Sequence, residues 1–392
     1  MKTFLIKYTV AILSCGLLLS ITGLTSHASL IEQKSIDIVF TGDTSFGENY
    51  LERVDQKGRE NILKTRGYQY SIENFSDFLQ QADLVIANLE TPLTDLPESP
   101  FANNKSYLHW GDPVKVPKAL KRNNIHVVSL ANNHSLDYGI QGLQQSIDAL
   151  NEHNIRWFGA GMNEASSNRP LQFDYLISEK NTKIIVAAGF EYRKHYDEKY
   201  AFYSRNEQGG TNAWTLERAS AQIKELRREN HRAFIIAYPH FGPNYTWKTQ
   251  SQAKLARTLI DAGADLVLGH GSHMVQEIER YKGRWIIYSL GNFVFNSPGR
   301  YKKEKADPFS LLAQLNISHI NNEMKFILNL YPIFSNNRIS HYQPYFVTQD
   351  QFNRVHEILL LQSTDDRLQS WMTPKHNHYG HHLSLDVTPI KQ

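Results

Sequence analysis

The sequence predicts an α/β fold in which short buried strands alternate with amphipathic helices. Short apolar runs recur along the 392 residues, and each ends at a glycine or at polar residues. Stretches with helical periodicity separate several of these runs, an alternation typical of sheets covered by helices. Because the chain has no Pro/Gly/Ser-rich linker and no repeat, we expect one large domain over 29–335 and a C-terminal extension over 336–392.

Each element follows from composition and length. Residues 36–41, IDIVFT, predict the first strand because β-branched and aromatic residues fill a run too short for a helix. On the same grounds, further strands are expected at 84–87, 126–130, 156–158, 183–188, 233–238, 265–268 and 285–289. Helical periodicity predicts helices at 71–81, 117–123, 140–153, 216–229 and 251–262.

The last quarter of the chain predicts a hairpin followed by a helix. Runs at 309–317 and 324–330 flank Asn321 and Asn322, which suit a tight turn. Residues 351–361 predict a terminal helix. The tail from Gln362 is polar, and we expect a solvated end whose histidine-rich segment, 376–382, could bind a metal ion only adventitiously.

The N-terminus predicts a signal peptide over residues 1–28. Lys2 and Lys7 precede an apolar stretch over 8–24, and the small residues Ser26 and Ala28 fit a cleavage site. We therefore expect an exported protein, periplasmic or extracellular; an uncleaved segment that anchors the chain is the alternative. The single cysteine, Cys15, lies in this segment, so the mature chain would have neither disulfides nor a thiolate nucleophile.

The net charge gives no argument for nucleic-acid binding. The formal charge of the whole chain is +3, and loss of the two lysines in residues 1–28 lowers it to +1. A nearly neutral chain lacks the electrostatic footprint that binding to nucleic acid requires.

Metal-binding residue types follow five of the expected strands, where open α/β sheets build their sites. They are Asp43, Glu90, Asn133 with His134, His240, and His270 with His273. Taken singly, each fits a simpler role, such as a cap for Asp43, a left-handed turn for Asn133 or a solvated loop for the final histidines. One shared metal site explains the presence of metal-binding residue types at five strand ends better than five unrelated local roles do.

The mixture of residue types indicates a divalent ion of the manganese, iron or zinc class. Carboxylates and amide oxygens bind hard or borderline cations, and neutral imidazole binds transition metals. Such an ion binds anionic oxygen and lowers the pKa of a bound water. His134 would lie beside the ion and could protonate a leaving group, with Asp137 as a candidate to fix its tautomer.

Six segments carry a resemblance to a known family. They are FTGDTSFGENY (40–50), ANLETPLT (87–94), SLANNHSLDYG (129–139), YPHFGPNY (238–245), LGHGSHMVQ (268–276) and YSLGNFVF (288–295). In this order, over about residues 35–300, they resemble the CapA-type poly-γ-glutamate capsule biosynthesis proteins, which have the fold of calcineurin-like metallophosphoesterases. The resemblance implies a four-layer α/β/β/α sandwich with mixed sheets and a site at the strand ends.

The resemblance also assigns roles. Asp43 matches the first metallophosphoesterase block, Glu90 the bridging acid, Asn133 and His134 the Asn-His pair, and His240, His270 and His273 the last two blocks. Three departures stand out: Ser45 replaces the histidine of Asp-x-His, Glu90 replaces an aspartate, and the last block is His-x-x-His. We therefore expect an asymmetric centre for one or two ions. Asn133, His240 and one final histidine would form the better position, Asp43 would serve a weaker one, and Glu90 would bridge them.

Two functions remain open. The first is a secreted metal-dependent hydrolase of an anionic envelope polymer or a phosphoester, with His134 as the acid. The second is a non-catalytic assembly or export factor that binds the polymer in the same pocket beside membrane-associated capsule synthesis machinery. Asn88, Tyr245 and Asn292 are candidate substrate contacts, although Asn292 also suits a turn after Gly291. The loops 98–110 and 191–210 offer aromatic and basic side chains for an acidic ligand.

Overall fold

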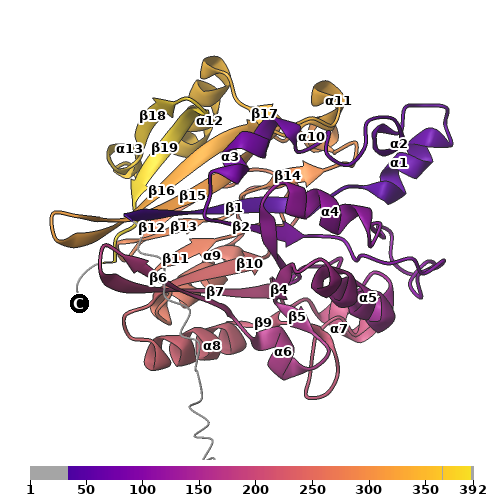
Figure 1. Cartoon of the computed structure of the whole chain (residues 1–392), viewed down its shortest axis with the longest axis horizontal. Helices are drawn as coiled ribbons and strands as arrows, with labels where there is room; N and C mark the ends of the chain where they lie inside the picture. The colour runs from indigo at the N-terminus through magenta and orange to yellow at the C-terminus, as the bar shows by residue number, and fades with distance from the viewer. Residues whose placement is uncertain (1–33, 364, 390–392) are drawn as a thin grey trace, which may run out of the picture. The chain divides into compact units, whose positions relative to one another are not determined.

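Two mixed β-sheets stack face to face in the computed structural model, which describes residues 34–363 and 365–389 (Figure 1). The expected signal peptide lies outside the described residues. The larger sheet has the order β18-β19-β16-β15-β1-β2-β3-β4, with β14 on β1 and β17 on β16. Its strands are β1 (Ser35–Ser45), β2 (Leu84–Leu89), β3 (Ile125–Ser129), β4 (Arg156–Phe158), β14 (Asn292–Phe295), β15 (Phe309–Ile320), β16 (Glu323–Phe334), β17 (Tyr345–Phe346), β18 (Thr373–Asn377) and β19 (Gly380–Asp386).

The smaller sheet has the order β12-β13-β11-β10-β7-β6, with β9 on β7. Its strands are β6 (Leu171–Ile177), β7 (Lys180–Glu191), β9 (Ala213–Trp214), β10 (Phe234–His240), β11 (Leu266–Leu268), β12 (Ile278–Tyr281) and β13 (Arg284–Ile287). A separate two-stranded ribbon pairs β5 (Ala160–Gly161) with β8 (Gly210–Thr211).

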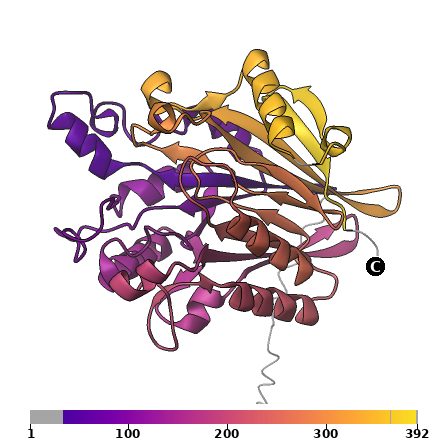
Figure 2. The same ribbon diagram turned by 180° about the vertical axis from the view of Figure 1, so that it is seen from behind.

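Helices cover the outer faces of both sheets (Figure 2). They are α1 (Glu48–Asp55), α2 (Ile62–Thr65), the 3₁₀ turn η1 (Glu73–Phe75), α3 (Ser76–Gln80), α4 (Lys115–Arg122), α5 (Gly139–Glu152), α6 (Glu164–Asn168), α7 (Lys194–Tyr200), α8 (Leu216–Glu229), α9 (Gln250–Asp261), α10 (Tyr301–Glu304), α11 (Asn337–Ser340), α12 (Gln349–Gln362) and α13 (Leu368–Trp371). Threonine side chains cap α8, α9 and α12 by accepting a backbone N–H of the first turn, as residues favoured at N-caps do.

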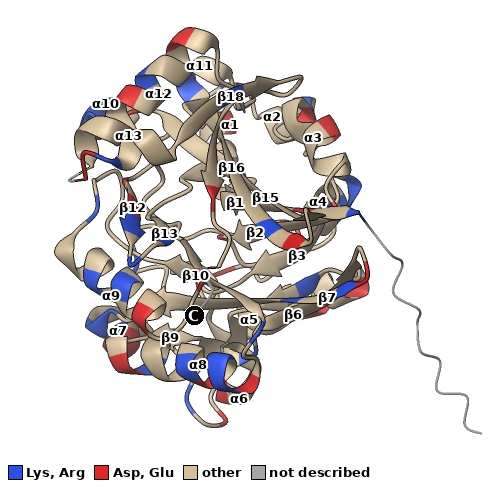
Figure 3. Ribbon diagram, turned by 90° about the vertical axis from the view of Figure 1, so that its left-hand side faces the viewer, with Lys and Arg blue, Asp and Glu red and all other residues tan. Residues whose placement is uncertain are grey.

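Successive side chains of a strand point to opposite faces of the sheet, so each sheet packs against the other sheet on one face and against helices on the other. On β1, Ile38 and Phe40 face the core between the sheets, and Val39 faces the core under α3, α4 and α5. On β10, Ile236 faces the central core and Ile235 faces α8 and α9. Charged residues lie on the outward surfaces of α6, α8 and α9 (Figure 3). The predicted four-layer α/β/β/α sandwich is confirmed.

The expected strands and helices are present; among the differences, the longer β1, the unpredicted strand β14 and the unpredicted edge strands β6 and β12 affect the site or a sheet edge. β1 continues past Thr41 to Ser45 because Asp43 and Ser45 pair in parallel with Asn292 and Phe295 of β14. β6 was not predicted; it is an antiparallel edge strand on β7. The β15–β16 hairpin is confirmed, and Asn321 and Asn322 both have positive φ, as a type I′ turn requires.

The expectation of a solvated tail is wrong. β18 and β19 form a hairpin, and β19 pairs with β16 at the edge of the larger sheet. Leu383 and Leu385 are fully buried, and α12 packs in the same core. The alternation HLSLDV carried this signal within a polar context. Within the described residues, no helix has the length and apolar composition needed to cross a bilayer.

Candidate metal centre

The site forms where the carboxyl ends of β1, β2 and β10 meet the turns after β3 and β11. Asp43 aligns in register with Asn88 of β2 and Asn292 of β14. Gly42, just before it, allows the backbone of the Leu290–Gly291 turn to approach closely. A Cβ at Gly42 would lie 1.8 Å from the Gly291 carbonyl oxygen, which accepts a hydrogen bond of 2.8 Å from Asp43 N. Glycine at this position is therefore a condition for placing Asp43 in the site.

Two buried groups of ligand atoms share Asp43. One consists of Asp43, His240 and His270, and the other of Asp43, Glu90 and His273, with the atoms of each group within 4.8 Å of one another. In the first group, Nδ1 of His240 lies 3.0 Å from Nδ1 of His270, and Asp43 Oδ1 lies 3.4 Å from the latter. All five residues are at most 5% exposed. The structure therefore brings together five of the six predicted metal ligands in two overlapping groups.

Glu90 lies at a convergence of three histidines. Its Oε1 is 3.8 Å from Nε2 of His134, 3.9 Å from Nε2 of His240 and 3.8 Å from Nε2 of His273. Neither carboxylate oxygen has a hydrogen-bond partner among the described residues. A buried, unpaired carboxylate ringed by imidazole nitrogens is costly unless a cation lies between them. These residues therefore fit a divalent ion of the class that binds nitrogen and oxygen ligands.

Burial sets the protonation of the histidines. It lowers the pKa of His240 and His270, reinforced at His240 by the neighbouring His270, so both rings favour the neutral form that binds metals. For Asp43, burial would raise the pKa, but hydrogen bonds from His270 and His273 outweigh it and hold the pKa well below its usual value. Burial, and then the charge of Asp43, raises the pKa of Glu90 well above its usual value.

His273, in the turn after β11, is oriented by Asn292 at the start of β14 and by Tyr301 at the start of α10. Its Nδ1 lies 2.9 Å from Asn292 Oδ1, and Asn292 Nδ2 donates to the Tyr301 hydroxyl at 3.1 Å. The Tyr301 hydroxyl in turn donates to the His273 carbonyl oxygen at 2.9 Å. A proton on Nδ1 leaves Nε2 of His273 free toward Glu90, so Asn292 acts on the centre by fixing the tautomer of this ring.

Asn88 has a supporting position. It is fully buried; its Nδ2 donates to Asp43 Oδ1 at 2.9 Å and its Oδ1 accepts from Asn132 Nδ2 at 3.0 Å. The structure thus uses both ends of the Asn88 amide inside the protein, and Asn88 does not line the adjoining cavity. Asn133 does line the cavity, and its buried Oδ1 has no hydrogen-bond partner within the described part of the chain, which suits a ligand atom.

His134 is held by Asp137, as the sequence predicts. Its Nδ1 lies 2.7 Å from Asp137 Oδ2, which leaves Nε2 directed toward Glu90. Burial, followed by the charge of Lys105, lowers the pKa of His134 well below its usual value. Burial raises the pKa of Asp137 although the Lys105 ammonium opposes this effect. Lys105 Nζ contacts Asp137 Oδ1 and donates to the Asn133 carbonyl oxygen at 3.0 Å.

Two residues of this cluster were not predicted to act in the site. His109 was expected only as a residue of the ligand-binding loop 98–110, and Lys105 was not expected to have a role. His109 stacks on His134, donates its backbone N–H to Asp137 Oδ2 at 2.6 Å, and directs Nδ1 to the Glu90 carbonyl oxygen at 3.0 Å. No periodicity or motif in residues 98–110 marks these contacts, because the path of that loop is set by tertiary packing.

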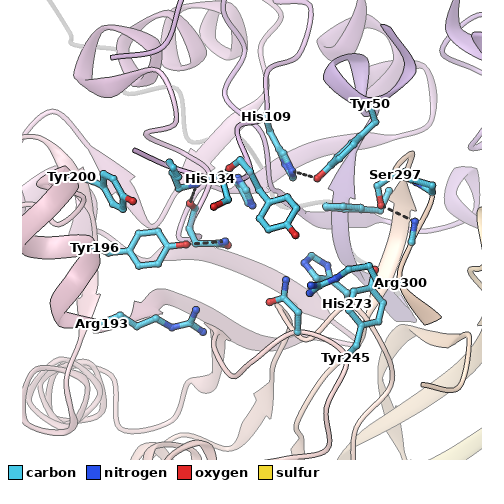
Figure 4. Close-up of a pocket in the computed structure, with 18 of the residues that line it drawn as sticks. Tyr50, His109, His134, Arg193, Tyr196, Tyr200, Tyr245, His273, Ser297 and Arg300 are labelled. Atoms are coloured by element: carbon cyan, nitrogen blue, oxygen red, sulfur yellow. Dashed lines mark hydrogen bonds between the residues drawn. The ribbon is translucent and has the colours of Figure 1, made fainter. Parts of the chain in front are cut away.

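A cavity of about 390 Å³ opens beside the centre (Figure 4). His134, His273 and Asn133 reach it from the centre, and Tyr245 lines it as expected of a substrate contact. Its cationic lining residues are Lys105, Arg193 and Arg300. Figure 4 shows Arg193 and Arg300 on different sides of the cavity. Of the two loops predicted to contact a ligand, residues 98–110 contribute Tyr107 and His109, and residues 191–210 contribute Arg193.

The grouping of ligands differs from the expected one. The sequence predicted Glu90 as the bridge and Asp43 in a weaker position only, whereas Asp43 belongs to both groups. The cause is the extension of β1, which carries Asp43 between His240 of β10 and the two histidines that follow β11. Ser45, in place of the histidine of Asp-x-His, is fully buried, and its hydroxyl has no partner among the residues described.

Two stacked mixed sheets with a carboxylate and histidine centre at their strand ends define a protein with a metallophosphoesterase-like fold. Residues 37–297 match the model of the bacterial capsule synthesis protein family, PGA_cap, and the chain belongs to this family. The PGA biosynthesis protein CapA of Bacillus subtilis (strain 168) is 31% identical over 259 residues, which cover 66% of this chain and 62% of that protein.

Two further relatives also match over part of the chain. The capsule biosynthesis protein CapA of Bacillus anthracis is 27% identical over 279 residues, covering 70% of this chain and 63% of the relative. A probable polyglutamine synthesis accessory protein of Mycobacterium tuberculosis (strain CDC 1551 / Oshkosh) is 31% identical over 227 residues, covering 55% and 57%. The match spans less than two thirds of each of these relatives.

Proposed function

We propose that this protein is a metal-dependent hydrolase that acts on an anionic envelope polymer or a phosphoester during capsule or exopolymer synthesis. The observation that carries the proposal is the pair of overlapping, buried ligand groups that border a cavity with cationic walls. Its relatives bear names of PGA, capsule and polyglutamine synthesis proteins, which supports an envelope polymer as the substrate class.

The proposed role of each residue follows from its position in the site. Asp43, Glu90, Asn133, His240, His270 and His273 would hold one or two ions. A divalent ion held there would polarise an anionic oxygen of the substrate and lower the pKa of a water. Arg193 and Arg300 bind acidic groups on either side of the reacting bond, and Arg193 is fixed for this by its hydrogen bond of 2.7 Å to the Gly242 carbonyl oxygen. Nε2 of His134 takes or returns the proton, with Asp137 holding Nδ1.

One observation favours a second candidate, a polymer-binding assembly or export factor without catalysis. Ser45 stands where the larger superfamily has a metal-binding histidine, so one nitrogen ligand of that centre is missing, and Ser45 belongs to neither of the two ligand groups found among the described residues. In this alternative, the same cationic cavity binds the polymer beside the synthesis machinery. Export after cleavage of residues 1–28 belongs to both candidates; anchoring by an uncleaved segment is the alternative, and the N-terminal sequence of the mature protein distinguishes them.

Turnover separates the two candidates. The wild type and His134→Ala are compared on a chromogenic phosphoester and on poly-γ-glutamate, each with Mn²⁺, Fe²⁺ or Zn²⁺ added to metal-free protein. The hydrolase proposal expects cleavage of at least one substrate by the wild type and a loss of about 10²–10⁴-fold in the variant. If the polymer binds but neither substrate is cleaved faster by the wild type than by the variant, the protein is a binding factor.

A further inference from the structure

A second cavity, of about 820 Å³, adjoins the one beside the metal centre. Tyr50 and Pro298 line both cavities, so the two are neighbours across these side chains. The walls of the second cavity come from α1, α2 and the chain that follows each, and from α11 and the residues after it. These three helices lie on the same side of the molecule (Figure 1).

The lining of this second cavity is strongly basic. It contains five Arg or Lys side chains, namely Arg53, Lys57, Arg59, Arg66 and Arg338, together with His341. Glu60 is the single acidic residue of the lining, and its carboxylate is occupied by Thr65 Oγ1 at 2.7 Å and by Arg66 Nε at 3.4 Å. Arg53, Lys57 and Arg59 have no carboxylate within 4.0 Å in the described ranges, and all three are exposed.

Apolar side chains lie between these cations. Val54, Ile62, Tyr70 and Tyr342 line the same cavity, and Ile62 is buried. A surface that combines unpaired guanidinium and ammonium groups with aliphatic and aromatic walls fits a chain that carries acidic groups on a carbon backbone. It fits a bare inorganic polyanion less well, because the apolar walls would then have no partner.

We infer that the second cavity is a binding subsite for a polycarboxylate chain that extends past Tyr50 and Pro298 from the cavity at the metal centre. This inference rests on the proposed function for the identity of the neighbouring site, but it concerns affinity and does not require turnover. The subsite would hold acidic groups several residues away from the reacting bond. The protein would therefore bind long acidic chains more tightly than short ones.

The test measures binding to the metal-free full chain by fluorescence anisotropy. The probes are labelled γ-glutamyl oligomers of about ten residues and of two residues, and inorganic polyphosphate of comparable charge. The variant is Arg53→Gln/Lys57→Gln/Arg59→Gln. The matched control is Lys224→Gln/Arg232→Gln/Lys254→Gln, which removes the same charge from exposed positions outside both cavities. Thermal unfolding verifies that both variants fold.

If the subsite exists, the cavity variant should bind the ten-residue oligomer about tenfold more weakly than the wild type does, and this binding should depend less steeply on salt. The cavity variant should bind the two-residue oligomer as the wild type does. The control variant keeps wild-type affinity. Equal losses in the two variants, or no loss in the cavity variant, would overturn the subsite. Tighter binding of polyphosphate than of the long oligomer would overturn its assignment to a polycarboxylate. Loss of affinity in the cavity variant, together with no turnover by the metal-loaded wild type in the assay described above, would support the subsite and contradict the hydrolase.

Discussion

The imidazole of His109 lies parallel to that of His134, with ring centroids 3.6 Å apart and 1° between the ring planes. The two residues also share an acceptor, because Asp137 Oδ2 lies 2.6 Å from the His109 backbone nitrogen and 2.7 Å from Nδ1 of His134. The stack fixes the plane in which His134 presents Nε2 to Glu90. His109 is therefore a positioning residue of the centre, although it belongs to neither ligand group.

Replacement of His109 by Phe tests this arrangement, since the ring stack can persist while both ring hydrogen bonds are lost. The Glu90 carbonyl oxygen and the Tyr50 hydroxyl, each 3.0 Å from a ring nitrogen of His109, would lose their partner. We expect the free energy of unfolding in urea to fall by about 1–3 kcal/mol, and metal content to stay unchanged. Tyr50→Phe, which removes one of the two bonds, should cost about 1 kcal/mol. Wild-type stability in His109→Phe would contradict the assignment.

Metal content should depend on Asp43 more than on any single histidine. Asp43→Ala removes the residue common to both ligand groups, so we expect almost no bound ion after dialysis, measured by inductively coupled plasma mass spectrometry. His270→Ala and His273→Ala each disrupt one group and should retain an intermediate content. Ser45→Ala, two residues along the same strand, is the matched control and should bind like the wild type. Full occupancy in Asp43→Ala would show that the shared carboxylate is dispensable.

Stability should depend on pH through Glu48, which is buried in α1. Burial raises its pKa from 4.5 to about 7. Between these values the folded protein keeps a proton that the unfolded chain releases, so the contribution to stability is present at low pH and is lost as the pH rises through 7. Glu48→Gln cannot titrate, and its Oε1 can still accept the Asp112 backbone N–H, which lies 3.0 Å from Glu48 Oε1.

The stability of Glu48→Gln relative to the wild type should therefore increase between pH 5 and pH 7.5, by about 2–3 kcal/mol, and then level off. Urea unfolding at several pH values measures this difference. Glu52→Gln, exposed on the same helix, controls for the loss of one negative charge. A constant difference across this pH range would mean that Glu48 does not take up the proton.

Asp265, at the start of the strand that leads to His270, should be critical for folding. Its Oδ2 accepts from Arg227 Nη2 at 2.6 Å and from the Ile235 backbone N–H at 2.8 Å, and its Oδ1 contacts Arg284 Nη1. We expect Asp265→Asn to lower the free energy of unfolding by about 2–4 kcal/mol, because two partly buried arginines lose their counter-charge. Asp261→Asn, which removes an exposed pair with Lys282, should change it by less than about 1 kcal/mol.

The ligands could be predicted from the sequence because each lies at the end of a strand, and parallel strands bring such ends together. Asp43, His240 and His270 all follow this rule. The shared role of Asp43 could not be predicted, since it depends on the extension of β1 beside β14. Lys105 was missed because a lysine between Asn104 and Ser106 in a loop has the sequence context of a solvated residue, yet only 6% of its side chain is exposed.

Prediction of the fold succeeded where the elements have a clear hydrophobic period. It failed where the elements are short or polar. α8 spans Leu216–Glu229 as predicted, because its apolar positions repeat at helical spacing. β19 was missed because its two buried leucines alternate with polar residues in a tail rich in histidine. Its strand character depends on pairing with β16, a contact distant in sequence.

The pairing of β1 also determines when the centre can form. Asp43 lies on a strand whose neighbours include β15, and their register joins Ile36 to Ile317. A contact of such long sequence separation forms late, because a large loop must close before any pairing offsets its entropy. During synthesis, β1 must wait until most of the chain has been made. The compartment in which folding is completed, and the metals present there, would then decide which ion the centre acquires.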